Sequence, residues 1–153
     1  MLGRRVKRTR RGEFQLRLPP EERELLRDLP AQLRDVLASD DPALRRLFPP
    51  AYKDDPALEA EYRHFMGDDL LATHTKSLQA MEDTIDAEVV DEDQLVGWLG
   101  ALNDLRLVLG TRLDVTEDMY DHEMDPGDPR APAFAMYTYL GWLQEQVVDA
   151  LSS

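Results

Sequence analysis

The stretch WLGALNDLRLVLGTRL (Trp98–Leu113) is apolar over most of its length, yet a polar trio of Asn103, Asp104 and Arg106 lies in its middle. At about 100° per residue, Arg106 falls inside an arc of apolar side chains. That arc is made by Leu95, Trp98, Leu99, Leu102, Leu105, Leu109 and Leu113. A helix that is apolar nearly all round is buried by its neighbours, so this segment is expected to form the centre of the fold.

Arg106 is therefore expected to be mostly buried and to bond a carboxylate from another helix, because an unpaired buried charge is costly. The candidate carboxylates are Glu61, Asp68, Asp69 and Glu145. In the favoured, structural interpretation, Arg106 fixes the helix register and Asn103 satisfies nearby backbone groups. In the alternative, Arg106 and Asn103 hold an anionic ligand in a pocket. Asp104 and Arg112 are further candidates for contact with a ligand or a partner.

Outward from this helix, apolar spacing predicts more helices and an N-terminal pair of strands. Phe14, Leu16 and Leu18 alternate with polar residues, which predicts a strand that pairs with residues 4–10 in a hairpin. The first expected helix, 21–37, is kinked or split at Pro30, and the second, 56–85, is capped by Asp55 and bent or broken at Gly67. The third, 92–110, is capped by Asp91 and ended by Gly110, and the last covers 132–148. Short helical turns are expected after Asp41 and from Thr116.

These elements define a mainly α fold, a multi-helix bundle around a buried central helix with a short N-terminal β-hairpin. The 153 residues suit a single domain, in which residues 1–18 form the basic hairpin and residues 19–153 the helical body.

Charge is divided unevenly along the chain, whose net charge is −13. Residues 1–46 hold twelve Lys and Arg against eight Asp and Glu, whereas residues 47–153 hold six against twenty-three. Such an acidic body disfavours binding to nucleic acid or anionic membranes and favours a basic partner. The chain has no cysteine, which excludes disulfides, thiolate metal sites and thiol redox chemistry. With neither a secretory signal nor an apolar run long enough for a membrane span, a cytoplasmic protein is expected.

The N-terminal strand concentrates cations: Arg4, Arg5, Lys7, Arg8, Arg10 and Arg11. They could contact the phosphates of DNA or RNA. The alternative is a solvated hairpin edge, or a strand that docks on the acidic body of its own chain. No aromatic residue interleaves the run, so stacking on single-stranded bases is poorly supported. Binding of nucleic acid is therefore an open alternative that is not favoured.

Catalytic and metal-binding motifs are weak in this sequence. Glu61-x-x-His64 is half of a di-iron motif whose second half is missing, and the cluster Asp121-His122-Glu123 has no ligand spacing that specifies an ion. His74 lies on an apolar stripe and is expected to be a core residue. Because a glycine-rich phosphate loop and a nucleophile elbow are also missing, we expect no metal, no cofactor and no enzymatic activity.

The last helix has an apolar inner face and carries aromatic residues on a face that is otherwise polar. Tyr137, Leu140, Leu143, Val147 and Leu151 should face inward, whereas Phe134, Tyr139 and Trp142 point elsewhere. Aromatic residues on an outer face can mark a protein contact, and Trp142 is the candidate anchor. The alternative is that they pack against the basic hairpin or a neighbouring helix.

Three strings carry a resemblance to a known family: RLFPPAYKDDPALEAEYRHF (46–65), WLGALNDLRLVLGTRLDV (98–115) and YTYLGWLQEQVVDAL (137–151). With them the chain resembles an actinobacterial family of unknown-function domains typified by the actinomycete oxidative stress regulator (AosR-like). The resemblance implies a helical cytoplasmic protein, not a known enzyme, that regulates stress genes through a transcription partner such as an alternative sigma factor. Redox control in such a regulator is attributed to a cysteine pair, so a thiol switch does not carry over.

The function that we expect is therefore a non-enzymatic regulatory protein that acts through protein contacts. A protein partner, such as a sigma factor, is expected, and a homodimer is an open alternative. The competing hypotheses are an anion-binding protein or enzyme with a pocket around Arg106, and direct binding of DNA by the basic hairpin.

Overall fold

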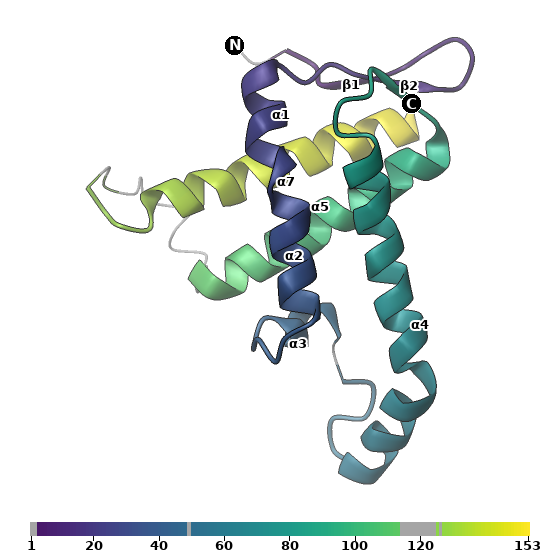
Figure 1. Ribbon diagram of the computed structural model, residues 1–153, viewed down its shortest axis with the longest axis vertical. Helices are drawn as coiled ribbons and strands as arrows, with labels where there is room; N and C mark the ends of the chain where they lie inside the picture. The colour runs from purple at the N-terminus through teal and green to yellow at the C-terminus, as the bar shows by residue number, and fades with distance from the viewer. Residues whose placement is uncertain (1–2, 49, 114–124, 126) are drawn as a thin grey trace.

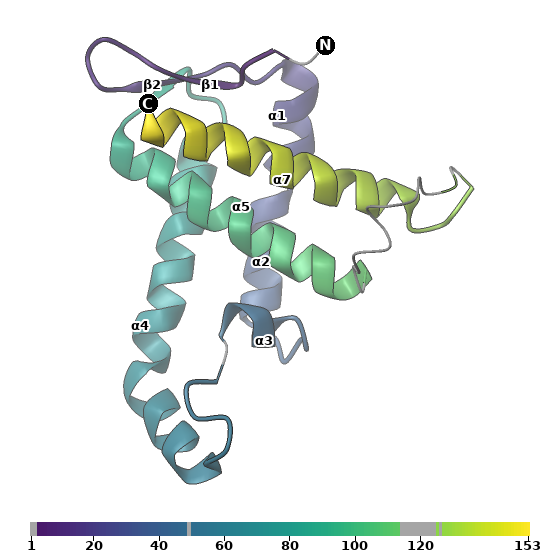
Figure 2. The same ribbon diagram turned by 180° about the vertical axis from the view of Figure 1, so that it is seen from behind.

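Helix α5 (Glu92–Leu113) is the centre of the fold in the computed structural model, which describes residues 3–48, 50–113, 125 and 127–153. Helix α7 (Ala131–Ser152) runs along one side of α5, and the C-terminal part of α4 (Pro56–Asp83) crosses another side (Figures 1 and 2). The largest fully buried side chains come from these helices, from the hairpin and from the helical residues 20–37, and they include Phe14, Leu26, Leu33, Leu78, Met81, Leu95, Trp98, Leu102, Leu140 and Leu143. The predicted mainly helical fold around a buried central helix is confirmed.

Side-chain caps explain where α4 and α5 begin. Asp91 Oδ1 accepts from the Gln94 N–H, and Gln94 Oε1 accepts from the Asp91 N–H, so each side chain satisfies a free donor of the first turn. Asp55 Oδ1 accepts in the same way from the Leu58 N–H at 3.1 Å. The predicted stop of α5 at Gly110 is wrong, because the helix continues to Leu113. This glycine makes room instead: a Cβ on it would lie 3.0 Å from the ring of Tyr137.

Proline and glycine act differently in the other helices. The predicted split at Pro30 is confirmed, since α1 (Pro20–Arg27) ends before Asp28 and α2 (Leu29–Leu37) has the proline in its first turn. A short helix, α3 (Leu44–Leu47), follows Asp41. The predicted break at Gly67 is wrong, because α4 runs through it uninterrupted. The expected turn from Thr116 lies outside the described residues.

The N-terminal hairpin belongs to a three-stranded antiparallel sheet. Strand β1 (Val6–Arg8) pairs with β2 (Phe14–Leu16), and β2 pairs with β3 (Val89–Val90) in the order β1-β2-β3. The hairpin was predicted from its alternation, but β3 is too short to give a pattern of its own. Gly12, with a φ of 80°, takes the left-handed turn conformation that favours glycine. The sheet buries its apolar side against the helices.

Two glycines bring α5 close to α4. A Cβ on Gly97 would lie 2.5 Å from Ala80 Cβ, and a Cβ on Gly100 would lie 2.6 Å from Ser77 Oγ. Both contacts lie in the last third of α4, and the N-terminal half of that helix extends away from the rest of the molecule (Figures 1 and 2). The crossing is therefore a close backbone contact at one end of a long helix.

We expect the Gly97→Ala variant to unfold more readily than the wild type, because its methyl group would force α4 and α5 apart. Overpacking costs about 1–3 kcal/mol and the better helix propensity of alanine returns up to about 1 kcal/mol, so a net loss of roughly 1 kcal/mol is expected in urea unfolding. Gly67→Ala is the matched control, since a Cβ there meets no atom within 4 Å. A loss of stability in both variants, or in neither, would contradict the close contact.

Candidate functional site

Asp104 makes the buried ion pair of the central helix. It is 4% exposed, and its Oδ2 lies 2.5 Å from Nδ1 of His74 on α4. The edge of the Phe48 ring packs against the same imidazole, at 4.9 Å between centroids. The hydrogen bond to Asp104 raises the pKa of His74, although burial opposes the shift. The carboxylate from the neighbouring helix therefore favours the protonated form of half-buried His74.

Arg106 does not make the ion pair that the sequence predicted. The residue is half-buried, and among the described residues no carboxylate lies within ion-pair distance of its guanidinium. Its Nε is buried and hydrogen-bonds no described atom. Of the four predicted partners, Glu61, Asp68 and Asp69 lie on the distant half of α4, and Glu145 is near Arg106 but unpaired with it. The chain of Arg106 lies over Gly141, where a Cβ would be 3.6 Å from Cδ.

The remaining two candidates on α5 have ordinary contacts. Asn103 Oδ1 accepts a hydrogen bond from Gln144 Nε2 of α7 at 3.4 Å. Arg112 pairs with Asp41 at 2.9 Å near the surface, and its side chain is half exposed. The four candidate residues on α5, Asn103, Asp104, Arg106 and Arg112, therefore do not converge on one site.

A surface pocket lies where Arg106 meets α7. We call it the Arg106 pocket; it has a volume of about 560 Å³. Its lining is Arg106, Tyr137, Thr138, Gly141, Trp142, Gln144, Glu145, Val148 and Asp149. It therefore joins two residues that the sequence singled out separately, Arg106 and Trp142, to two carboxylates.

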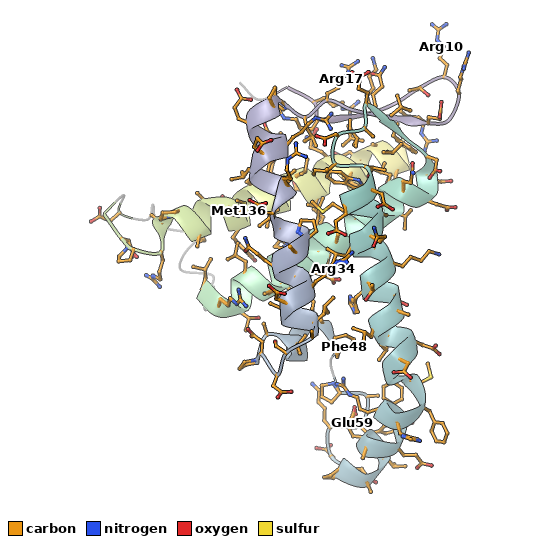
Figure 3. All side chains as sticks on the ribbon, viewed as in Figure 1. Arg10, Arg17, Arg34, Phe48, Glu59 and Met136 are labelled. Atoms are coloured by element: carbon orange, nitrogen blue, oxygen red, sulfur yellow. The ribbon has the colours of Figure 1, made fainter. Side chains whose placement is uncertain are left out.

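The cations of the hairpin divide into two groups. Arg5 is buried, pairs with Glu22 of α1 at 2.7 Å and lies over the ring of Trp142, 5.2 Å from its centroid. Arg8 donates to the Leu151 carbonyl of α7 at 3.2 Å. The other four cations, Arg4, Lys7, Arg10 and Arg11, are exposed, and Figure 3 shows Arg10 pointing away from the protein. Two of the six cations thus fasten the hairpin to the helical body.

Glu22 is the acceptor at the centre of this attachment. Its carboxylate also accepts from the Tyr139 hydroxyl at 2.7 Å. Burial alone would raise the pKa of Glu22, but the hydrogen bonds from Arg5 and Tyr139 outweigh it and the pKa is lowered. Burial and the bond to Glu22 both raise the pKa of Tyr139. The three side chains form one charged and hydrogen-bonded cluster between the hairpin, α1 and α7.

Trp142 is half-buried beside this cluster. Its indole lies near both Arg5 and Tyr139, and the ring centroid of Tyr139 is 6.0 Å away. The contact with Arg5 is packing against the hairpin, which is the alternative that the sequence left open for Trp142. Phe134, the third aromatic residue of this face, stacks with Tyr137 at 6.3 Å. The role of Trp142 as an anchor for a partner stays a prediction.

The N-terminal part of α4, residues 56–73, carries a surface that the sequence did not predict. We call this part of the helix the α4 arm. Large apolar side chains are exposed along it or just before it: Tyr52, Leu58, Phe65, Met66 and Leu71. Phe65 is 70% exposed, far more than a core position allows. The arm also carries four carboxylates against the single cation Arg63, and Figure 3 shows Glu59 near its end.

The described residues give no metal-binding group. Within them, no three His, Asp or Glu side chains converge as metal ligands, and both Glu61 and His64 are exposed on the α4 arm. The cluster Asp121-His122-Glu123 lies outside the described residues. None of the described helices is long and apolar enough to cross a membrane.

Comparison with known proteins agrees with the resemblance. The model of the family described as "Domain of unknown function (DUF2017)" matches residues 3–151. A Mycobacterium leprae protein that bears the AosR name is 33% identical over 73% of this chain. The oxidative stress regulators AosR of Mycobacterium bovis and Mycobacterium tuberculosis are each 32% identical over 72% of it. The matches span 59% and 58% of the lengths of these relatives, and no solved structure matches the chain.

We expect the His74–Asp104 pair to make stability depend on pH. Because the pKa of His74 is raised in the folded state, the pair stabilises the fold fully below the unfolded value of about 6.5 and loses this effect as pH rises through the folded pKa. The measurement is the midpoint of thermal unfolding against pH for the wild type and His74→Gln, with NMR titration of the ring. A ring that titrates at or below the unfolded value would contradict this assignment.

We expect the Arg5→Ala variant to lose about 3 kcal/mol of unfolding free energy, because it leaves the Glu22 carboxylate partly buried and unpaired. Urea unfolding measures the loss. Arg4→Ala is the control, since it removes the same charge from an exposed neighbouring position. Equal effects of the two changes would show that the hairpin is not fastened by Arg5.

Proposed function

The chain belongs to the DUF2017 family, and from this premise we propose that it is a stress-response regulator that works through contact with a protein partner. Its similarity to AosR proteins supports the regulatory role. We propose further that it has no enzymatic activity of its own and that its partner is part of the transcription machinery, such as an alternative sigma factor. The lack of cysteine means that a thiol switch in this chain is not part of the mechanism.

The α4 arm is the observation that carries this proposal. A regulator that acts by contact needs a surface that its own fold leaves uncovered. On the arm, Phe65 and Met66 are adjacent and exposed, and Leu58 lies two turns before Phe65 on the same side of the helix. Neighbouring exposed apolar side chains on a polar background are typical of protein–protein contacts. The arm would lie in an apolar groove of its partner.

Charge indicates what kind of partner the arm would meet. The arm is acidic, and it belongs to the part of the chain with twenty-three carboxylates against six cations. Opposite charges speed association, so a basic partner is favoured over an acidic one. The hairpin is a weaker candidate for a nucleic-acid site because Arg5 and Arg8 are used to hold it in place.

The test is binding of the full chain to purified sigma factors and RNA polymerase from the organism that encodes it. We expect Phe65→Ser to weaken binding by about 2 kcal/mol or more, as for an interface hot spot, without lowering the melting temperature. Leu25→Ser is the matched control, because Leu25 is also exposed, at 45%, but lies on α1. Raising salt should slow association more than it speeds dissociation.

Two results would contradict the arm as the contact surface. One is binding that Phe65→Ser and Leu25→Ser weaken equally. The other is a defect in Trp142→Ala at an unchanged melting temperature while Phe65→Ser binds normally, which would move the contact to α7. If none of the sigma factors or polymerase subunits binds, the proposed partner class is wrong.

A further inference from the structure

The Arg106 pocket presents an arginine with no partner among the described residues. The guanidinium is restrained, because its aliphatic chain crosses the space above Gly141 and its Nε is buried without a hydrogen bond. Since Nε is covered by protein atoms, a ligand in the pocket would accept from the two terminal nitrogens of Arg106, which hydrogen-bond no described atom. The guanidinium fork suits a carboxylate, which can accept two parallel hydrogen bonds.

The pocket also holds negative charge at a separate position. Glu145 and Asp149 are one helical turn apart on α7, so they share a face, and neither pairs with Arg106. A purely anionic ligand would be attracted by one charge and repelled by two. A purely cationic ligand would be repelled by the guanidinium of Arg106. A molecule with both a carboxylate and an ammonium group matches the whole set of charges.

The rest of the lining fits a small molecule with an apolar part. Trp142 and Val148 offer apolar surface, and Val148 is 43% exposed. The indole of Trp142 is held on one side by the cation of Arg5, so this wall is already ordered. A volume of about 560 Å³ lies in the usual range for small-molecule sites.

We propose that the Arg106 pocket binds a small zwitterion of the amino-acid class. Its carboxylate accepts from Arg106, its ammonium group lies near Glu145 and Asp149, and an apolar side chain packs on Trp142 and Val148. This site goes beyond the proposed partner contact, because it lies on α7 and α5, not on the α4 arm.

The test uses isothermal titration calorimetry of the full chain with the common amino acids, of which L-leucine represents the apolar ones. N-acetyl-L-leucine, which lacks the ammonium group, and L-leucinamide, which lacks the carboxylate, are the ligand controls. We expect free amino acids with apolar side chains to bind at least tenfold more tightly than either blocked form. If no amino acid shows saturable binding up to about 10 mM, a free energy near −2.7 kcal/mol, the proposal is overturned.

Variants of the pocket test which residues contact the carboxylate and the ammonium group of the ligand. Arg106→Gln should weaken binding of the free amino acid at least tenfold and leave the melting temperature unchanged, since this arginine pairs with no carboxylate of the described residues. Glu145→Gln together with Asp149→Asn should remove the preference for the free over the acetylated form. Lys76→Gln, which removes an exposed cation from α4, is the control for net charge. Binding that Arg106→Gln does not change, or a preference that survives loss of both carboxylates, would overturn the proposal whatever the protein partner is.

Discussion

The close crossing of α4 over α5 at Gly97 and Gly100 is the contact on which the arrangement of the other helices depends. Two helices that touch at one crossing point separate steadily on either side of it. Because the contact lies near Ser77 and Ala80, some 20 residues of α4 remain on one side, roughly 30 Å of helix. His74 in this stretch still contacts Asp104 of α5, but the residues before it lie beyond the reach of α5. The exposed arm therefore follows from the position of two glycines. The exposed position of the α4 arm does not follow from its own apolar residues or from its helix propensity.

The same crossing decides how the polar trio of α5 is satisfied. Asp104 and Arg106 are two residues apart, about 200° around the helix, so they face opposite sides. Asp104 faces α4 and meets His74, whereas Arg106 and Asn103 face α7. From the arc of leucines the sequence predicts a mostly buried Arg106, and in the structure the residue is half-buried. The periodicity of one helix does not predict which neighbouring helix packs against each part of that arc, because this depends on the tertiary fold.

Prediction from sequence was accurate where the cause is local. Caps at Asp55 and Asp91, the break before Pro30 and the alternation in the hairpin each depend on a few neighbouring residues, and all are present in the structure. It failed where the cause lies elsewhere in the chain. Gly110 makes room for Tyr137, a Cβ on Gly67 would meet no atom within 4 Å, and β3 forms by pairing with β2. The Arg106 pocket could not be predicted from one helix alone, because Arg106 lies on α5 and Trp142 lies on α7.

Trp142 belongs to the lining of the Arg106 pocket and also contacts Arg5 and Tyr139 of the cluster that holds the hairpin. One side of its surroundings is the Arg106 pocket, and the other is Arg5, which with Glu22 and Tyr139 holds the hairpin. Shared contact alone does not couple a ligand to the hairpin, because a ligand shifts only an equilibrium whose two states it binds differently. The coupling would require a second position of the indole, with Arg5 released and the pocket reshaped. Arg5 also bonds the carboxylate of Glu22, so this release would cost an ion pair, and a ligand would have to bind the released state more tightly by at least that amount.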